Sequence, residues 1–458
     1  MSHFRNLEQL VNHGAISARR TALACLDVAL DAADTYEGTR RIVRWEGEIL
    51  QVGDVRFDRR VCPGNIYVIG AGKGSLPIAR ALDELLGPAI TRGVVAIKED
   101  PPQSLTRIRV VKAAHPVPDA RSLQSGQEVL EISGGLKPDD VVFACMTGGC
   151  SSLMVLPVDG VTLDDKIRLN QLLLRTGARI GEMNAVRKHV SRIKGGGLVR
   201  LLQPATVITL TQDTAPESLP WPDPSLPDPT TFAEAIEVLK RYEIWEQTPE
   251  SIRLYLQRGL GDPALETPKN FNGWRTHLFD TGNQRSACLA AVEKARILGY
   301  AGHILSTNLE GESREVGTVL SGIAKEIQRF GRPFSPPCVL VSAGETTVAI
   351  KGPAGEGGPN QETVLGFAKN VAGCPQIVIA SIDSEGTDGP TDIAGGIADG
   401  ETAARLKAKG FDLFDVLNRH DTSPALRALG DAVITGATGT NVVNLRVLVI
   451  ETAAGATR

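Results

Sequence analysis

A lysine stands inside a glycine-rich turn, Gly70-Ala71-Gly72-Lys73-Gly74-Ser75, directly after the apolar run Ile66–Ile69. Glycines allow backbone N–H groups to approach a phosphate or a carboxylate, and a helix beginning there adds the positive end of its dipole. The turn lacks the third glycine of a dinucleotide fingerprint and the glycine spacing of a Walker A loop. It therefore predicts either an anion site with Lys73 as a point charge, or a tight turn with Lys73 in solvent.

A second small-residue turn, Thr147-Gly148-Gly149-Cys150-Ser151-Ser152, follows the apolar run Val141–Met146. Its composition suits an anion-binding nest of backbone amides. No activating base is identifiable near Cys150, which favours a buried or idle thiol over a nucleophile. Farther along, Arg187, Lys188 and His189 precede Lys194 and a run of glycines. These cationic side chains suit an anionic substrate, although a solvated helix face has a similar composition.

Carboxylates gather in the segment from Ser384 to Asp392, after the apolar run Ile377–Ser381. Glu385, Asp388 and Asp392 on such a turn, at the end of a strand, are typical of metal–phosphate sites or general bases. Aspartate and glycine are also ordinary turn residues, so a purely structural turn is the alternative.

Two further polar positions are candidates. Asn360 lies in Gly357-Gly-Pro-Asn-Gln-Glu362, and His115 begins His115-Pro-Val-Pro-Asp119. His115 is a candidate proton carrier, with a packing or hydrogen-bonding role as the alternative. No His/Cys cluster has the spacing of a zinc site.

The elements that must position these residues alternate between strands and amphipathic helices. Strands are predicted at the following runs: 66–69, 94–97, 108–111, 141–146, 303–306, 338–341, 346–350, 377–381 and 445–450. This alternation is typical of parallel strands with helical crossovers, that is, a layered α/β fold. We expect two domains, residues 1–270 and 271–458, with a ligand cleft between them and a proline-rich loop or flap at 211–231.

Composition narrows the class of protein. The chain has 458 residues, 42% of them hydrophobic, with 49 Lys+Arg against 53 Asp+Glu. The net charge of −4 argues against a broad nucleic-acid-binding surface. No apolar run reaches the ~18 residues of a membrane span, and the first residues lack the order of a signal peptide. The seven cysteines have no paired spacing. We therefore expect free thiols, a cytoplasmic location and no membrane partner.

Taken together, the motifs resemble the glycerate 2-kinase family, whose C-terminal region is the MOFRL domain. The resemblance runs in unbroken order from about Ala15 to Ile450 and rests on eight segments. These are 70–73, 115–119, 184–196, 227–231, 309–312, 344–347, 388–392 and 438–442. It implies a two-domain α/β enzyme, with a Rossmann-like N-terminal domain and a smaller C-terminal MOFRL domain, that uses ATP and Mg²⁺ to phosphorylate the 2-hydroxyl of D-glycerate.

The resemblance also implies roles for particular residues. Lys73 is the key active-site lysine, and Glu385 and Asp388 are the catalytic carboxylates. Asp388 and Asp392 would hold the metal. Substrate or phosphate would be bound by the following residues: Gly72, His115, Gly148, Gly149, Ser151, Arg187, Lys194 and Asn360. The expected partner is a small anionic hydroxy acid, and a homodimer is the candidate assembly.

The sequence departs from the family pattern at positions expected in the active site. Pro359 replaces the arginine of Gly-Gly-Arg-Asn-Gln-Glu, which removes a charge and an N–H donor. Glu385 replaces an aspartate and moves the carboxylate outward by about one methylene. These changes leave alternatives open: a lyase, isomerase or hydrolase acting on a sugar-derived acid without ATP, or a non-catalytic acid-binding protein. The incomplete dinucleotide fingerprint counts against an oxidoreductase.

Overall fold

The chain divides into two compact units in a computed structural model that describes residues 2–98, 104–212, 224–374 and 376–452. The inner unit is Thr35–Thr281. The terminal unit combines Met1–Asp34 with Gly282–Arg458. The predicted division at residue 270 differs from this one, because the N-terminal helix α2 (Ile16–Ala33) packs on the sheet of the terminal unit and not on that of the inner unit.

The inner unit is built on a six-stranded sheet in the order β6-β5-β4-β7-β8-β9, in which all paired strands are parallel. The strands are β4 (Ile66–Ala71), β5 (Ile90–Ile97), β6 (Ile108–Lys112), β7 (Val141–Met146), β8 (Thr206–Thr211) and β9 (Thr276–Asp280). The chain moves outward from β4 in one direction and from β7 in the other. This order of strands is that of a Rossmann fold, so the Rossmann-like prediction is confirmed.

Helices cover both faces of this sheet, as parallel strands require. Helix α4 (Ser75–Leu86) packs on one face, in a core shared with the antiparallel meander β1 (Val43–Glu46), β2 (Ile49–Val52) and β3 (Val55–Asp58). Helices α5 (Ala120–Ser133), α6 (Cys150–Leu153) and α9 (Gly197–Leu201) cover the other face.

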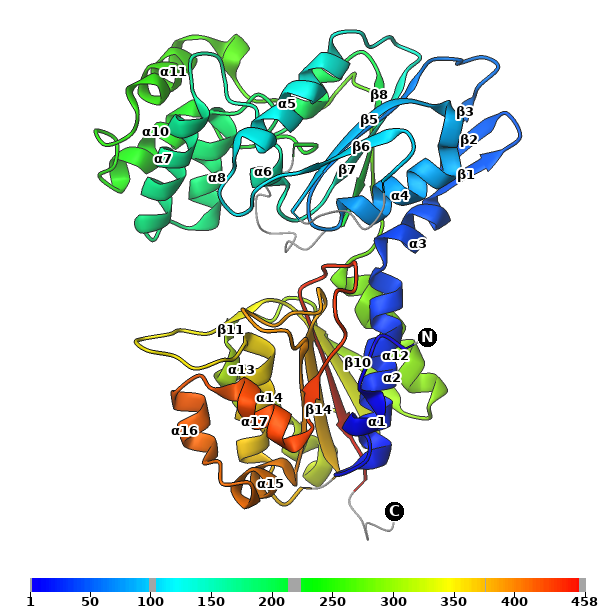
Figure 1. The fold of residues 1–458 in the computed structure, drawn as a ribbon, viewed down its shortest axis with the longest axis vertical. Helices are drawn as coiled ribbons and strands as arrows, with labels where there is room; N and C mark the ends of the chain where they lie inside the picture. Colours follow the sequence, from blue (N-terminus) through cyan, green and yellow to red (C-terminus); the bar gives the residue numbers. More distant parts are fainter. Residues whose placement is uncertain (1, 99–103, 213–223, 375, 453–458) are drawn as a thin grey trace. The chain divides into compact units, whose positions relative to one another are not determined.

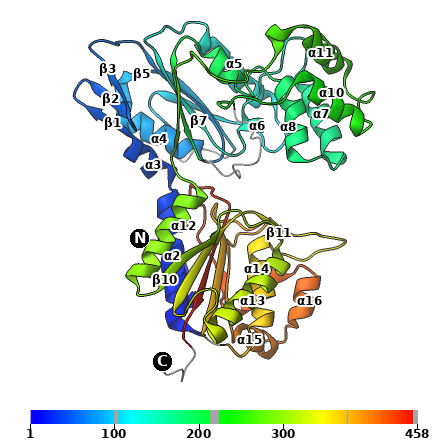
Figure 2. The same ribbon diagram turned by 180° about the vertical axis from the view of Figure 1, so that it is seen from behind.

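A separate helical cluster completes the inner unit. It contains α7 (Leu163–Arg175), α8 (Ile180–His189), α10 (Phe232–Arg241) and α11 (Glu250–Gly261), which lie beyond the sheet at the end away from β1–β3 (Figure 2). Phe232 is buried among these helices and packs against the rings of His189 and Tyr255. The cluster holds α8, and therefore its cationic side chains, in a fixed position beside the sheet.

The terminal unit has a mixed sheet in the order β10-β12-β17-β14-β15-β16. Its strands are β10 (Ala301–Ser306), β12 (Cys338–Ala343), β14 (Ile377–Asp383), β15 (Gly395–Asp399), β16 (Ala432–Val433) and β17 (Asn444–Ile450). Strand β17 runs antiparallel to both β12 and β14, so the carboxyl ends of β12 and β14 lie at the same edge. The acidic segment begins at that edge.

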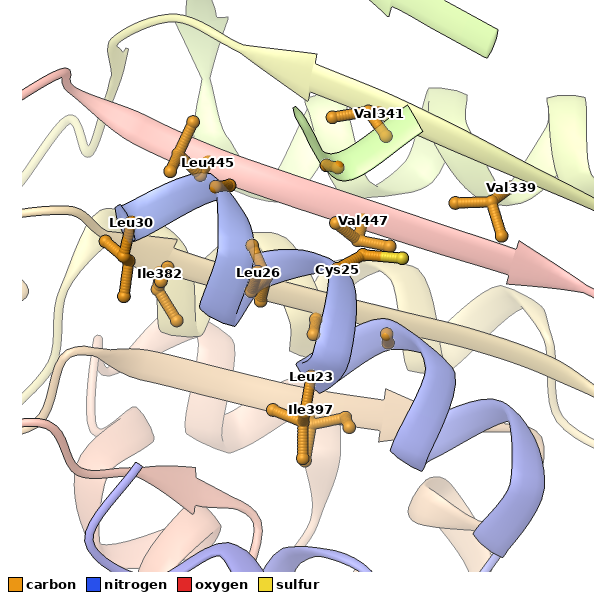
Figure 3. Packing of buried hydrophobic residues seen from close by; sticks show 14 of the residues in the cluster. Leu23, Cys25, Leu26, Leu30, Val339, Val341, Ile382, Ile397, Leu445 and Val447 are labelled. Carbon is orange, nitrogen blue, oxygen red and sulfur yellow. The ribbon is translucent and has the colours of Figure 1, made fainter. Parts of the chain in front are cut away.

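Helices α2 and α12 (Gln284–Ile297) cover one face of the mixed sheet, and α13 (Ser313–Phe330) and α14 (Pro359–Asn370) cover the other (Figure 1). Leu23, Leu26 and Leu30 of α2 point onto β14, β15 and β17 (Figure 3). Each fully buried leucine contributes roughly 1.5–3 kcal/mol. This apolar face of α2 explains why a segment so distant in sequence belongs to the terminal unit.

Several sequence predictions differ from the structure in extent. The run 346–350 forms strand β13 only at Thr346–Thr347, where it pairs with β11 (Gly311–Glu312), and Ile350 is exposed. The proline-rich segment 211–231 lies partly outside the described residues, because 213–223 are not described. All seven cysteines are free thiols, as predicted. Among the described residues, none of the helices combines the length and apolar character needed to cross a bilayer.

Candidate active site

The loops that carry the predicted anion-binding turns follow β4 and β7, the two neighbouring strands at which the sheet order reverses. In open α/β sheets, ligands bind outside the carboxyl ends of the strands at this switch point. The N–H of Lys73 donates to the carbonyl oxygen of Gly148 at 2.8 Å, and the N–H of Gly74 donates to Thr147 Oγ1 at 3.0 Å. These bonds join the two turns into one structure.

The amides that are open to a ligand are not those of the first turn. The N–H groups of residues 72–75 all donate to oxygens of the protein. By contrast, the N–H groups of Gly148 and Gly149 have no acceptor in the part of the chain that the structure describes. Of the two turns predicted to bind an anion, the one at Gly148–Gly149 offers the open amides, and Gly149 adopts φ +90° there.

Lys73 and His115 both lie close to Gly149 of this cradle. A methyl group added to Gly149 would be 3.3 Å from His115 Cδ2 and 3.4 Å from Lys73 Cγ. Lys73 is exposed and His115 is half-buried. The structure therefore brings two backbone donors, the side-chain stem of Lys73 and the imidazole of His115 together from three separate sequence motifs.

A small cavity lined by cations lies next to the cradle. Lys166, Arg187 and Lys194 line it with Ser151 and Asn170, and it leaves about 10 Å³ for the centre of a water-sized group. Lys194 Nζ donates to the carbonyl oxygen of Ser151 at 2.8 Å. Arg187 Nε donates to Asn170 Oδ1 at 2.9 Å, and Lys166 Nζ donates to the carbonyl oxygen of Val190 at 3.0 Å.

This cavity has an excess of positive charge. None of the described residues that line it carries a carboxylate. Burial, reinforced by the charges of Lys194 and Arg187, lowers the pKa of Lys166 well below its usual range. Burial also lowers the pKa of Arg187. Because clustered buried cations repel one another and lack hydration, a bound anion would stabilise all of them.

Lys166 was not among the sequence candidates, although a signal was present. On α7 it shares the buried face with Leu169 and Leu173, at the i, i+3 and i+7 positions. A lysine on the apolar face of an amphipathic helix must be buried, and burial of a charge needs a specific reason. That pattern could have identified it.

Lys188 and His189, the two residues after Arg187, form contacts outside the cavity. Lys188 Nζ forms a buried ion pair with Asp228 Oδ1 at 3.2 Å. His189 Nε2 lies 2.8 Å from Glu266 Oε1. Of the three consecutive basic residues, only Arg187 lines the cavity, while Lys188 and His189 hold α8 to the loops around Asp228 and Glu266.

In the terminal unit, Asp388 caps a helix. Its Oδ1 accepts from the N–H of Asn360 at 3.0 Å, and its Oδ2 accepts from the N–H of Gln361 at 3.0 Å. Asn360 Nδ2 donates to the same carboxylate at 2.9 Å and to Asn444 Oδ1 at 2.8 Å. Asp388 is fully buried, and burial raises its pKa, opposed by these hydrogen bonds. Asp388 and Asn360 thus lie together, as one buried network at the start of α14.

The other predicted carboxylates, Glu385 and Asp392, differ in their exposure to solvent. Asp392 is exposed and pairs with Arg427. Glu385 is half-buried, and Asn441 Nδ2 donates to its Oε1 at 2.8 Å. Asp383, which sequence reasoning missed, ends β14 and accepts from the N–H of Glu385 at 2.8 Å. No group of three or more His, Cys, Asp or Glu side chains among the described residues could hold a metal ion by itself.

A buried arginine lies close to these carboxylates. Arg446 is on β17, and burial lowers its pKa to about 10 against the opposing influence of Asp388 and Asp383. It donates from Nη2 to Thr346 Oγ1 at 2.7 Å and from Nη1 to the carbonyl oxygen of Gly344 at 3.1 Å. A charged residue within the apolar strand 445–450 was the available sequence signal.

Comparison with known proteins agrees with this architecture. Residues 21–257 match a family described as a domain of unknown function (DUF4147), and residues 338–444 match the MOFRL family. A glycerate 2-kinase of Pyrococcus horikoshii is 38% identical over 97% of this chain and 100% of its own. A D-glycerate 2-kinase of Thermotoga maritima is 38% identical over 83% of this chain and 89% of its own.

A solved structure has the same fold. The crystal structure of a glycerate kinase from Thermotoga maritima superposes with a TM-score of 0.81 at 33% identity, covering 93% of this chain and 97% of its own. The similarity to these relatives, in sequence and in fold, covers both units of the chain. The chain therefore belongs to the glycerate 2-kinase family and is a kinase-type enzyme with a C-terminal MOFRL region.

Proposed function

We propose that this enzyme transfers the γ-phosphoryl group of ATP to the 2-hydroxyl of D-glycerate, or of a closely related small hydroxy acid. The observation that carries the proposal is the cavity of Lys166, Arg187 and Lys194, whose described lining residues include three basic side chains and no carboxylate. A carboxylate matches the positive charge of these side chains. The relatives named glycerate 2-kinase support glycerate as the acid.

The cradle beside the cavity suits the reacting end of the substrate. The free amides of Gly148 and Gly149 and the ammonium group of Lys73 would stabilise the negative charge of the transferring phosphoryl group. The substrate hydroxyl oxygen forms the new bond to phosphorus, the bond from phosphorus to the bridging oxygen breaks, and ADP leaves. We assign the proton of the hydroxyl to His115, which lies against Gly149.

The proposal includes ATP and Mg²⁺. Magnesium is usually held by one or two carboxylates together with substrate phosphates and water, so a cage of protein ligands is not needed. Asp383 and Glu385 fit that donor set, because they are half-buried acidic residues two positions apart at the end of β14. Asp388 fits it less well, since both its oxygens already accept helix N–H groups. When bound, the metal would neutralise phosphate charge.

A substrate screen with product identification tests the proposal. The purified enzyme is incubated with D-glycerate, L-glycerate, lactate and tartronate, with and without ATP and Mg²⁺, and the products are identified by mass spectrometry. We expect a phosphorylated product only with ATP, and D-glycerate as the preferred acid. Conversion of an acid without ATP would instead support a lyase, isomerase or hydrolase. Binding of acids without any conversion would support a non-catalytic acid-binding protein.

A further inference from the structure

The terminal unit contains a second hollow, of about 370 Å³, that shares no lining residue with the site proposed above. It is lined by Glu312 at the end of β11, Arg314 in the first turn of α13, Lys351 in the loop after β13, Asn418 at the end of α16 (Leu413–Asn418) and His420 just beyond that helix. Its volume is within the range of sites for small metabolites. Every lining residue belongs to the terminal unit.

A buried carboxylate fixes two of the polar side chains. Glu362 of α14 is almost completely buried and accepts from Arg314 Nε at 3.1 Å and from Arg314 Nη2 at 3.4 Å. The same carboxylate lies 2.6 Å from His420 Nδ1. His420 itself adopts φ +52°, a conformation that few residues other than glycine adopt readily. The guanidinium and imidazole groups are therefore held in place before any ligand binds.

Three nitrogen atoms of the residues that line the hollow have no partner among the described residues. Within the described ranges, neither His420 Nε2, Arg314 Nη1 nor Lys351 Nζ forms a hydrogen bond or an ion pair. When Nδ1 carries the ring proton and donates to Glu362, Nε2 of the neutral ring is an acceptor. Protonation of the ring makes Nε2 a donor as well, beside those of Arg314 and Lys351. A fixed guanidinium, a lysine and a protonatable imidazole around one hollow are suited to an oxyanion.

The acidic residues around the hollow favour a ligand that carries hydroxyl groups as well as an anionic group. Arg314 and Lys351 balance Glu312 and Glu362 when His420 is neutral, and protonated His420 gives a net charge of +1. Glu312 accepts from the N–H of Ala349 at 3.0 Å and keeps capacity for further donors. A bare anion would therefore meet a carboxylate, whereas a ligand with hydroxyl groups would satisfy it.

We propose that this hollow binds a phosphorylated metabolite that carries hydroxyl groups, with its phosphate on Arg314, Lys351 and His420 and a hydroxyl on Glu312. The class includes sugar phosphates and nucleotides. Binding of such a ligand in the terminal unit would be independent of the proposed phosphoryl transfer.

Calorimetry on the full chain tests it with matched probes: ribose 5-phosphate, ribose, inorganic phosphate and ATP without metal. We expect ribose 5-phosphate or ATP to bind at least tenfold more tightly than inorganic phosphate, and ribose not to bind. Lys351→Ala and His420→Asn should each weaken binding at least tenfold. Asparagine tolerates the left-handed conformation and keeps a donor toward Glu362, so the second variant should fold. Lys325→Ala, an exposed lysine on α13, is the matched control and should bind normally.

Hydrogen exchange locates the ligand. Protection by ribose 5-phosphate or ATP in segments 311–318, 347–353 and 413–421 would support the proposal. Comparing how much Lys351→Ala and His420→Asn reduce the protection given by each ligand distinguishes a sugar phosphate from a nucleotide. Three results would overturn the proposal. They are protection confined to 147–155, equal binding by His420→Asn and the parent, and no binding of any phosphate at millimolar concentration. D-glycerate binding, assigned to the inner unit, should be unchanged in both variants, so this test can fail separately from the proposed function.

Discussion

Lys194 holds the loop after α8 against the loop after β7: its ammonium nitrogen lies 2.8 Å from the carbonyl oxygen of Ser151 and 2.5 Å from Ser151 Oγ. The two residues are 43 positions apart and belong to different sequence motifs. Lys194 is nearly fully buried. Its contact with Ser151 thus couples the position of the amide cradle at Gly148–Gly149 to the cation-lined cavity, which is the arrangement that the following predictions test.

Replacement of Lys73 by alanine should reduce turnover about 100-fold or more, because it removes a cation from beside the amide cradle. The melting temperature should hardly change, since the side chain is exposed. An ATP-coupled assay and thermal unfolding measure the two effects. Lys137→Ala is the matched control, an exposed lysine before β7, at the opposite edge of the sheet. Equal turnover of Lys73→Ala and the parent would remove Lys73 from the proposed mechanism.

Replacement of Lys166 by methionine should raise the KM for D-glycerate about tenfold or more, which corresponds to ~1.4 kcal/mol of lost carboxylate binding. Methionine has a similar volume but no charge, so the cavity keeps its shape. Steady-state kinetics with D-glycerate as the varied substrate measures this effect. An unchanged KM would show that the acid binds elsewhere.

The same variant should change the pH dependence of stability. The pKa of Lys166 is lowered in the folded state, whereas an unfolded lysine has a pKa of about 10.4. Between these two values the unfolded state binds more protons, so the free energy of unfolding of the parent should rise with pH. Lys166→Met should lack this contribution. Melting temperatures of both proteins from pH 6 to 10 test this, and parallel curves would contradict the assignment.

Replacement of Asp388 by asparagine should lower the free energy of unfolding by about 1–3 kcal/mol. The new amide group would face the N–H of either Asn360 or Gln361, both of which now donate to the carboxylate. Urea unfolding measures the change, and Asp392→Asn is the exposed control, expected within about 0.5 kcal/mol of the parent. Unchanged stability together with a weaker response to Mg²⁺ would instead make Asp388 a metal ligand.

Replacement of Pro359 by arginine should raise ATP-dependent turnover, because it restores a cation at the first residue of α14. Loss of the proline should cost only about 0.4–1 kcal/mol, since the first helical N–H has no helical partner in any case. Pro359→Ala separates the loss of proline from the gain of charge. If turnover with ATP were the same in all three proteins, a reaction without ATP would become the better explanation.

Local chemistry made much of this protein predictable from its sequence. Apolar runs that end in glycine-rich turns predicted β4, β7 and β14 and placed Lys73, Gly149 and Glu385 at strand ends. Period and turn composition are properties of neighbouring residues, so they need no knowledge of the fold. The same is true of the motifs that identified the family.

The tertiary structure decided which of these residues meet and what each one does. Packing of α2 on the mixed sheet assigned the first residues to the terminal unit, and the parallel order of β4 and β7 joined Lys73 to Gly148. Burial turned Asp388 into a helix cap and made Lys166 part of a cavity. Such roles depend on contacts between residues far apart in the chain, and on the cost of removing charge from water, which no local pattern contains.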